Sequence, residues 1–280
     1  MDDIEVRPLV DLPSLHRVEE LEQAIWGMTP RDVVPAHQLL AATTAGGLVL
    51  GALTPAGALV GFAYGFVGLR EGAVLFYSLM AGVRSDFRGS HVGFRLKCAQ
   101  REFVLAQGID RMVWTFDPLV SANASFNLHK LGAVACRYYV NHYGEMADDL
   151  NRGIESDRLE VDWWLCAPRV EAALRGDAHG ATWEDTVPVL DARPANTARA
   201  PGPVRFGVEA PLLRVEIPMA FDPLKAANPP LVQSWRLATR EAFRHYLGRG
   251  YCVVDFLRAP SATDAVGAHV LSRQPEATRP

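Results

Sequence analysis

The sequence has no apolar run long enough to cross a membrane. A spanning helix needs roughly 20 predominantly apolar residues, and no stretch of this chain approaches that length. Residues 1–5 are acidic and hold no apolar segment, which is not the pattern of a secretory signal. We therefore expect a cytoplasmic protein with no membrane partner.

Cysteine is sparse, and its spacing fits no known framework. The four cysteines are Cys98, Cys136, Cys166 and Cys252. They lack the paired spacing of a zinc site or of a small domain stapled by disulfides. We predict buried free thiols in a reducing cytoplasm and no metal site.

An excess of charge of one sign is also lacking. The 280 residues include 28 Lys and Arg against 32 Asp and Glu, a formal net charge of −4. This balance provides no basic surface for nucleic acid, so nucleic acid is not expected as a partner. With 49% apolar and 21% charged residues, the composition is that of an ordinary globular protein.

One stretch places a strand, a glycine-bearing turn and a helix in succession. Residues 73–83 are rich in β-branched and aromatic side chains, which predicts a buried strand, and apolar spacings of four and three predict a helix over residues 92–107. The turn between them leaves backbone N–H groups that favour an anion together with the helix dipole. Gly89 and Gly93 let a phosphate approach closely, and Arg88 adds positive charge.

The rest of the first half predicts further strands and helices. Strands are predicted at residues 4–8, 48–53, 58–67, 111–116, 136–142 and 161–166, and helices at 13–26, 35–44 and 121–131. Short turns join the strands at 48–53, 58–67 and 73–83, so we expect an antiparallel meander. A generic α/β domain fits the same pattern.

Two motifs resemble those of the GCN5-related N-acetyltransferase (GNAT) superfamily. The first, Val83-x-x-x-Phe87-Arg88-Gly89-x-x-Val92-Gly93-x-x-Leu96, is similar to the family's pyrophosphate-binding motif. The second, Asn123-x-x-Phe126-Asn127-Leu128-x-Lys130-Leu131-Gly132, resembles a later helix that ends just before a strand. Two positions depart from the usual pattern: His91 stands at the middle glycine, and Leu128 at a tyrosine that often lies near the sulfur.

The resemblance covers residues 4–166 and implies an α/β (α+β) fold, with a mixed, mostly antiparallel splayed sheet flanked by helices. It implies a catalytic domain over residues 1–175. Residues 176–203, rich in Ala, Pro, Arg and Thr, predict a linker or long loop. Residues 204–260 predict a small β-α-β extension that packs on the first domain or extends its sheet, and 261–280 a mobile tail. The chain thus resembles a longer member of the superfamily.

The resemblance also implies a co-substrate, acetyl-CoA or another acyl-CoA, and no metal. The residues that it assigns to the cofactor are Ala81, Val83, Arg88, Gly89, Ser90, His91, Val92, Gly93, Asn123 and Phe126. The main chain near Ala81 and Val83 would polarise the thioester carbonyl. If the turn holds phosphate, His91→Gly should tighten CoA binding.

Direct acyl transfer to an amine needs a base for the amine and an acid for the leaving thiolate. Asp117 follows a strand and precedes a proline, so it is a candidate base or amine anchor; the alternative is that it caps the following turn. Tyr138 is a candidate acid, with packing on its strand as the alternative. Ser78 is a candidate contact of the acyl group or the acceptor, against a simple core position.

Residues 141–158 are unusually polar for a connection between two strands. Long polar loops are where recognition residues concentrate. Glu145, Arg152 and Arg158 are therefore predicted to bind substrate, with Arg152 or Arg158 on a carboxylate of the acceptor or of a dicarboxylic acyl group. Surface salt bridges are the alternative.

These inferences favour an N-acyltransferase that moves an acetyl or succinyl-like group from acyl-CoA to the primary amine of a small molecule, such as an amino acid, in a ternary complex. Two alternatives stay open. One is a CoA-binding or regulatory module without turnover, suggested by His91 and Leu128. The other is a structural protein whose C-terminal part mediates homodimerisation.

Overall fold

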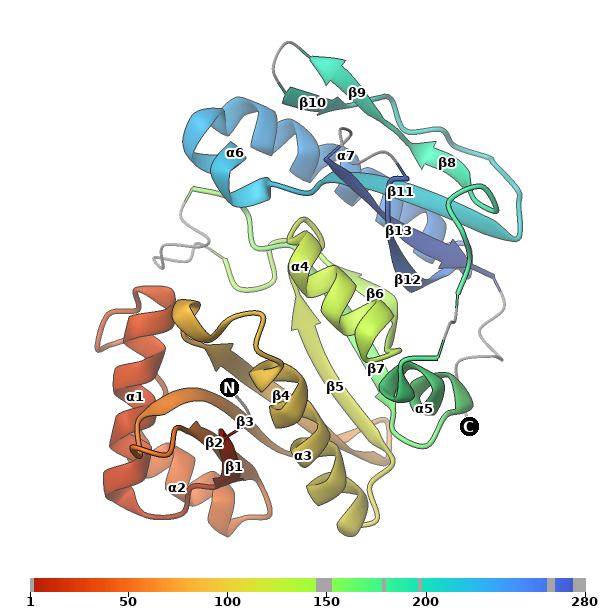
Figure 1. Ribbon diagram of the computed structural model, residues 1–280. Helices are drawn as coiled ribbons and strands as arrows, with labels where there is room; N and C mark the ends of the chain where they lie inside the picture. The colour runs from red at the N-terminus through yellow and green to blue at the C-terminus, as the bar shows by residue number, and fades with distance from the viewer. Residues whose placement is uncertain (1–2, 145–152, 178–179, 196–197, 261–264, 274–280) are drawn as a thin grey trace. The chain divides into compact units, whose positions relative to one another are not determined.

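The computed structural model describes residues 3–144, 153–177, 180–195, 198–260 and 265–273. The described residues form two compact units (Figure 1): unit 1 comprises those up to residue 114, and unit 2 comprises those from residue 115 onward. The chain passes from one unit to the other within strand β5 (Arg111–Phe116). No helix in these described ranges has both the length and the apolar character of a membrane span.

Unit 1 is a sheet with the strand order β1-β2-β3-β4-β5. Its elements are β1 (Glu5–Pro8), α1 (Leu12–Trp26), α2 (Ala36–Thr44), β2 (Leu48–Leu53), β3 (Leu59–Arg70), β4 (Ala73–Val83), the short 3-10 helix η1 (Ser85–Phe87), α3 (Val92–Ala106) and the start of β5. The first four strands pair antiparallel, and β4 pairs with β5 in parallel. The predicted meander is confirmed.

Helices cover both faces of this sheet. Helix α1 begins where the Asp11 carboxylate accepts the N–H of Ser14 at 2.9 Å, and it buries Leu15 and Val18 against one face. On the same face, a Cβ on Gly82 would lie 2.8 Å from the Trp26 ring. On the opposite face, a Cβ on Gly61 would lie 3.1 Å from Val92 of α3. Glycine thus lets α1 and α3 pack closely on the sheet.

Strand β4 extends past its pairing with β5 inside unit 1. The register joins Phe76 with Met112 and Tyr77 with Val113, and β4 continues to Val83. This is the opening that a splayed sheet has, as the resemblance implied.

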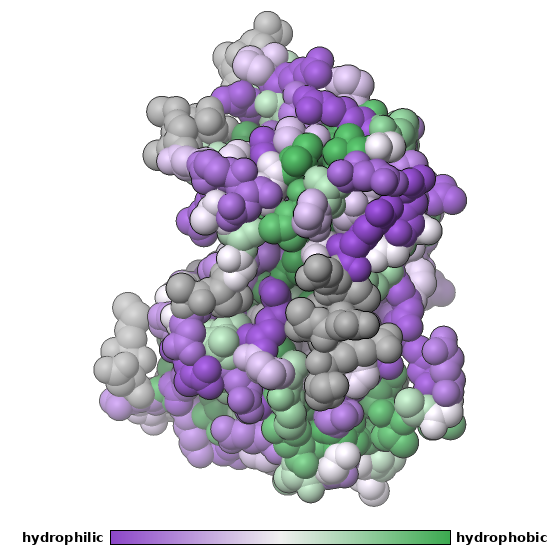
Figure 2. Space-filling model, turned by 90° about the vertical axis from the view of Figure 1, so that its right-hand side faces the viewer, coloured by the Kyte–Doolittle hydropathy of each residue, from purple (hydrophilic) through white to green (hydrophobic). Residues whose placement is uncertain are grey.

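The turn end of the β3–β4 hairpin extends beyond strand β2, because β2 pairs with β3 only as far as Gly65. Beyond that point Val67, Leu69 and Val74 are exposed. Figure 2 shows such apolar areas scattered among polar surface on one face of the molecule. Scattered exposed apolar side chains are normal in globular proteins.

Unit 2 contains a sheet with the order β7-β6-β12-β13-β11-β8, and a separate β9–β10 hairpin. Its elements are α4 (Ser121–Ala124), the π-helical η2 (Ser125–Lys130), β6 (Val134–Tyr139), β7 (Arg158–Trp164), α5 (Pro168–Arg175), β8 (Val187–Leu190), β9 (Ala192–Ala195), β10 (Ala198–Pro201), β11 (Leu212–Pro218), α6 (Phe221–Ala227), α7 (Pro229–Leu247), β12 (Cys252–Arg258) and β13 (Val266–Ser272). Neighbouring strands pair antiparallel except β8 and β11, which are parallel. The predicted mixed, mostly antiparallel fold class is confirmed.

The structure differs from the expected plan of the C-terminal half. The predicted linker, residues 176–203, holds β8, β9 and β10, and the predicted mobile tail, residues 261–280, holds β13. Of the two arrangements expected for the extension, the structure shows the one in which it extends a sheet, because β12 pairs with β6 and continues the sheet of β6 and β7. Strand β13 is buried between β11 and β12, and this pairing of distant segments leaves no periodic signal in so short a strand.

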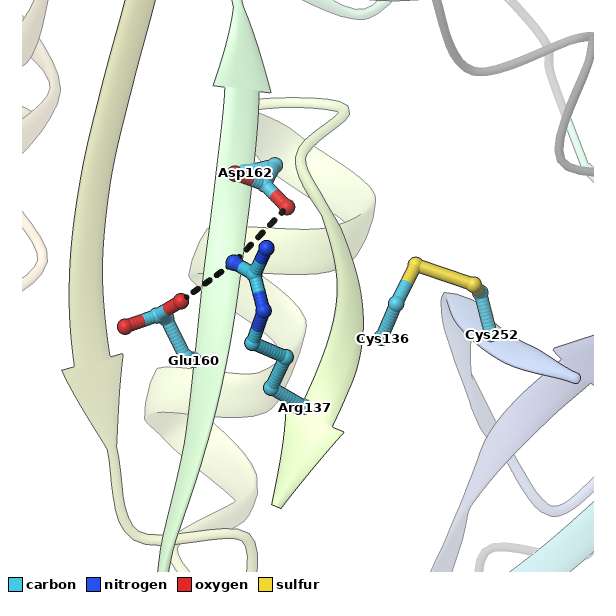
Figure 3. Close-up of a disulfide and its surroundings, with 5 residues drawn as sticks. All are labelled: Cys136, Arg137, Glu160, Asp162 and Cys252. Atoms are coloured by element: carbon cyan, nitrogen blue, oxygen red, sulfur yellow. Dashed lines mark hydrogen bonds and ion pairs between the residues drawn. A yellow bond between two sulfur atoms is a disulfide. The ribbon is translucent and has the colours of Figure 1, made fainter. Parts of the chain in front are cut away.

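A disulfide corrects the prediction of four free thiols. Cys136 of β6 and Cys252 of β12 are bonded, with their Cα atoms 4.4 Å apart, and Figure 3 shows them facing each other across neighbouring strands. The next residue, Arg137, lies over β7, where Nη1 is 2.7 Å from Glu160. Cys98 and Cys166 are free. Positions 136 and 252 are far apart in sequence, so spacing did not reveal the pair.

Cys252→Ser is expected to lower the free energy of unfolding by about 2–4 kcal/mol, because a disulfide that closes a long loop restricts the unfolded chain. The two cysteines are 116 positions apart. Urea unfolding without reductant measures the change. Cys166→Ser, at an exposed free cysteine, is the matched control and should leave the midpoint unchanged. Equal midpoints for both variants would contradict the disulfide's role.

Candidate functional site

The turn between β4 and α3 presents a run of unpaired backbone donors. The N–H groups of residues 89–93 donate to no protein acceptor in the described part of the chain. The start of an α-helix leaves such groups without intrahelical partners, and here the preceding turn residues add more of them. We call residues 88–93 the cradle turn.

Two left-handed residues shape the cradle turn. Gly89 has φ +81°, and a Cβ there would meet no atom within 4 Å, so only backbone conformation selects glycine. His91, the residue before α3, has φ 61°, a conformation that costs a non-glycine residue roughly 1–2 kcal/mol. Ser90 donates its hydroxyl to the carbonyl of Phe87, and buried Val92 anchors the helix start. The turn is therefore held in a strained shape by its neighbours.

Positive charge lies beside these donors. Arg88 is exposed, and its only protein partner in the described residues is the carbonyl of Val83, which accepts from Nε at 3.4 Å. Arg84, by contrast, is paired with Asp86 at 2.6 Å. Arg88 thus keeps its charge available for an anion.

The three predicted residues of β4 fall into two environments. Ala81 is exposed and Val83 is half-buried, both past the pairing with β5. Ser78 is buried, and its hydroxyl donates to Gln100 Oε1 at 2.8 Å and accepts from Lys97 Nζ at 2.7 Å. Ser78 therefore occupies a core position, which was the alternative to a contact with substrate. Its hydroxyl is hydrogen-bonded to two side chains of α3.

Two buried ionisable groups of unit 1 were missed from the sequence. Burial lowers the pKa of Lys97 to about 7, and its Nζ lies 3.8 Å from the centre of the Trp114 ring. Burial raises the pKa of Glu22 to about 7, and repulsion from Glu19 adds to the shift. A signal was present for Glu22, because it lies four residues after Val18 on the apolar stripe of α1.

The raised pKa of Glu22 predicts that the protein becomes less stable as the pH rises. The unfolded carboxyl ionises near pH 4.5 and the folded one near 7, so the free energy of unfolding decreases as pH rises through this window. Glu22→Gln should remove that decrease and be more stable than the parent at pH 8, by up to about 3 kcal/mol. Thermal unfolding of both proteins at pH 4.5 and 8 measures this. Glu20→Gln, exposed on the same helix, should reproduce the parent's pH dependence.

In unit 2, Asp117 is engaged by two arginines. Its carboxylate accepts from both terminal nitrogens of Arg236, at 3.0 and 2.6 Å, and lies 3.6 Å from Arg158. It also accepts the N–H of Leu119 at 2.9 Å. The carboxylate therefore caps the following turn, as the alternative had it, and both of its oxygens already accept from protein donors.

Tyr138 is also engaged. Its hydroxyl donates to Asp157 at 2.6 Å, and its ring stacks on Phe243 with centroids 5.6 Å apart. Burial, with the Asp157 charge beside it, raises the pKa of Tyr138 well above its usual value. A phenol with a raised pKa is a weaker acid, so the structure favours the packing alternative.

Of the three residues predicted to bind substrate, only Arg158 lies in the part of the chain that the structure describes. Arg158 is buried, with Nη1 donating to the carbonyl of Asp157 at 3.1 Å and the guanidinium 5.4 Å from the Tyr143 ring centre. It is neither a free anchor for a substrate carboxylate nor a surface salt bridge. Glu145 and Arg152 lie outside the described residues.

Helix α4 carries the second predicted cofactor motif. Asn123 is exposed and Phe126 is half-buried, so Asn123 has a side-chain amide open to a ligand. A groove of about 460 Å³ in unit 2 is lined instead by Phe206, Leu237, Arg240, Glu241, Arg244 and His245. None of the predicted residues lines it. In the described ranges, no group of three or more His, Cys, Asp or Glu side chains is arranged to hold a metal.

No family model and no curated protein matches the chain. Solved structures with partial similarity include a ribosomal-protein-S18-alanine N-acetyltransferase from Escherichia coli (12% identity, 64% of this chain and 97% of that one, TM-score 0.47). Others are Arabidopsis thaliana Naa50 with a bisubstrate analogue, CoA-Ac-MVNAL (17%, 57% and 97%, 0.46), and an aminoglycoside acetyltransferase from an uncultured soil metagenomic sample (18%, 45% and 85%, 0.40). Similarities of this strength assign no activity to the chain.

Proposed function

We propose that the chain is an acyl-CoA-dependent N-acyltransferase. The observation that carries the proposal is the cradle turn, in which the N–H groups of residues 89–93 have no protein partner in the described chain and Arg88 lies beside them. A pyrophosphate supplies the acceptor oxygens and negative charge that such a turn lacks. The motif over Val83 to Leu96 points to the pyrophosphate of CoA among possible anions.

The reaction proposed is direct attack of an amine on the thioester in a ternary complex. Backbone groups of β4 near Ala81 and Val83, past the pairing with β5, polarise the carbonyl. The thiolate of CoA leaves as the new amide bond forms, and the amine's proton passes to a base. Asp117 and Tyr138 are not assigned these proton transfers, because each is held in a hydrogen bond or ion pair.

We propose a primary amine of a small molecule as the acceptor, and acetyl or a succinyl-like group as the acyl chain. A homodimer and a cytoplasmic location belong to the same proposal. The Cys136–Cys252 disulfide is the observation that weighs against the cytoplasm, since structural disulfides belong mainly to oxidising compartments.

Gly89→Ala should weaken CoA binding about tenfold, since a Cβ disfavours the left-handed backbone that aims the N–H groups. His91→Gly should tighten it, because it removes a side chain at a position where the backbone must approach the phosphate. The matched control is Gly72→Ala, where φ is +79° and a Cβ also meets nothing within 4 Å. Isothermal titration with CoA measures all three variants. If Gly72→Ala and Gly89→Ala change affinity equally, the turn does not bind the pyrophosphate.

A second candidate is an acyl-CoA-binding module without turnover. The specific observation is that Ser78, Asp117 and Tyr138, the three predicted reactive side chains, are all engaged by protein partners. Binding and turnover therefore need separate measurements.

A thiol-release assay with acetyl-CoA and succinyl-CoA across a panel of amines tests turnover. We expect release that depends on one class of amine and that Gly89→Ala reduces. Protein without acyl-CoA corrects for the reactivity of Cys98 and Cys166, the free thiols. CoA binding without amine-dependent release identifies the second candidate.

A further inference from the structure

Helix α4 and the following η2 are too short to hold their own position. They comprise 4 and 6 residues, and isolated helices of this length are unstable in water. Their placement therefore depends on contacts from other segments. The C-terminal end is held where Trp163 Nε1 donates to the carbonyl of Leu131 at 2.8 Å and Arg169 Nε donates to that of Gly132 at 3.1 Å.

The other end is held by an ion pair from helix α7. Arg236 is only 1% exposed, and its two terminal nitrogens donate to the two carboxylate oxygens of Asp117. Asp117 lies four residues before the start of α4. The two residues are 119 positions apart in sequence. A bidentate pair of this kind fixes direction as well as distance, so it orients the turn that follows β5.

A histidine of β13 holds the next residue of that turn. His269 is fully buried, and its Nε2 lies 2.7 Å from the carbonyl oxygen of Pro118. A carbonyl only accepts, so Nε2 carries the hydrogen. Burial lowers the pKa of His269 to about 4, which keeps the imidazole neutral at pH 7. The rings of Phe116, Phe243 and Phe256 surround it, with centroids 5.2 to 6.4 Å away.

A third contact joins the first residue of α4 to the same C-terminal part. Ser121 Oγ donates to the carbonyl of Met219 at 2.9 Å, across 98 positions. Together the three contacts tie the stretch from Asp117 to Ser121 to segments beyond residue 218. The connection after β5 is thus shaped by the part of the chain that lies outside the resemblance.

We propose that Arg236 and His269 are positioning residues that set the turn after β5 and, through it, helix α4. The C-terminal extension is then a structural part of the transferase and not an appended module. The inference rests on the proposed function in one respect, because α4 carries Asn123 and the following η2 carries Phe126, two of the residues assigned to the cofactor.

The first test is hydrogen exchange of the full chain. His269→Leu removes the donor to Pro118, whereas His269→Gln keeps an N–H donor on a side chain of similar reach. We expect about tenfold faster amide exchange over residues 118–131 in His269→Leu, with residues 92–106 unchanged, and partial recovery in His269→Gln. Arg236→Gln should show the same local pattern. Arg244→Gln, exposed on α7, is the control and should exchange like the parent.

The second test is titration of the same variants with CoA. His269→Leu and Arg236→Gln should bind CoA about tenfold more weakly, and His269→Gln should recover part of the affinity. Faster exchange spread evenly over unit 2, or local exchange with unchanged affinity, would overturn the inference. The two proposals fail separately: if the parent does not bind CoA, the proposed function falls, while exchange over residues 118–131 still decides whether these residues position the turn.

Discussion

The buried pair of Asp117 and Arg236 is the interaction on which the arrangement of unit 2 depends. Moving two charges out of water costs several kcal/mol per ion, and here bidentate geometry and the Leu119 N–H offset that cost. Asp117 also pairs with Arg158, and a second group of ion pairs joins Arg240 to Glu155 and Asp157. Asp157 accepts from the Tyr138 hydroxyl as well, so both predicted reactive side chains of unit 2, Asp117 and Tyr138, already have protein partners.

Unit 1 is organised differently, around groups that lack partners. In the cradle turn, the N–H groups of residues 89–93 donate to no acceptor among the described residues, and the left-handed residues Gly89 and His91 shape the turn. Farther in, Glu22 and Lys97 are buried without a counter-charge in the described residues. Desolvation lowers the pKa of Lys97, and desolvation together with repulsion from Glu19 raises the pKa of Glu22, so both values move toward neutrality. Unpaired donors at the surface favour a ligand, whereas unpaired charges in the core favour the neutral form.

Local signals predicted most of the first half. The strands at residues 48–53, 73–83 and 111–116 have the predicted bounds, because each is a short apolar run between turn residues and needs no distant partner to be recognised. The segments that were missed, β8 to β10 and β13, are short or lack alternation. Strands β8 and β13 form because residues farther along or back in the sequence pair with them, and one sequence holds no record of that pairing. Strands β9 and β10 pair only with each other, as a short hairpin.

The sequence by itself determined the strand, the glycine turn and the helix on which the proposed anion site rests, because elements that follow one another place their backbone groups locally. Only the tertiary structure decided the roles of side chains whose partners come from elsewhere in the chain. Asp117 is neutralised by a residue 119 positions later, Ser78 faces a lysine of α3, and Cys136 meets Cys252. Burial and charge act through space, so the partners that engage these predicted reactive side chains in the fold could not be identified from the sequence.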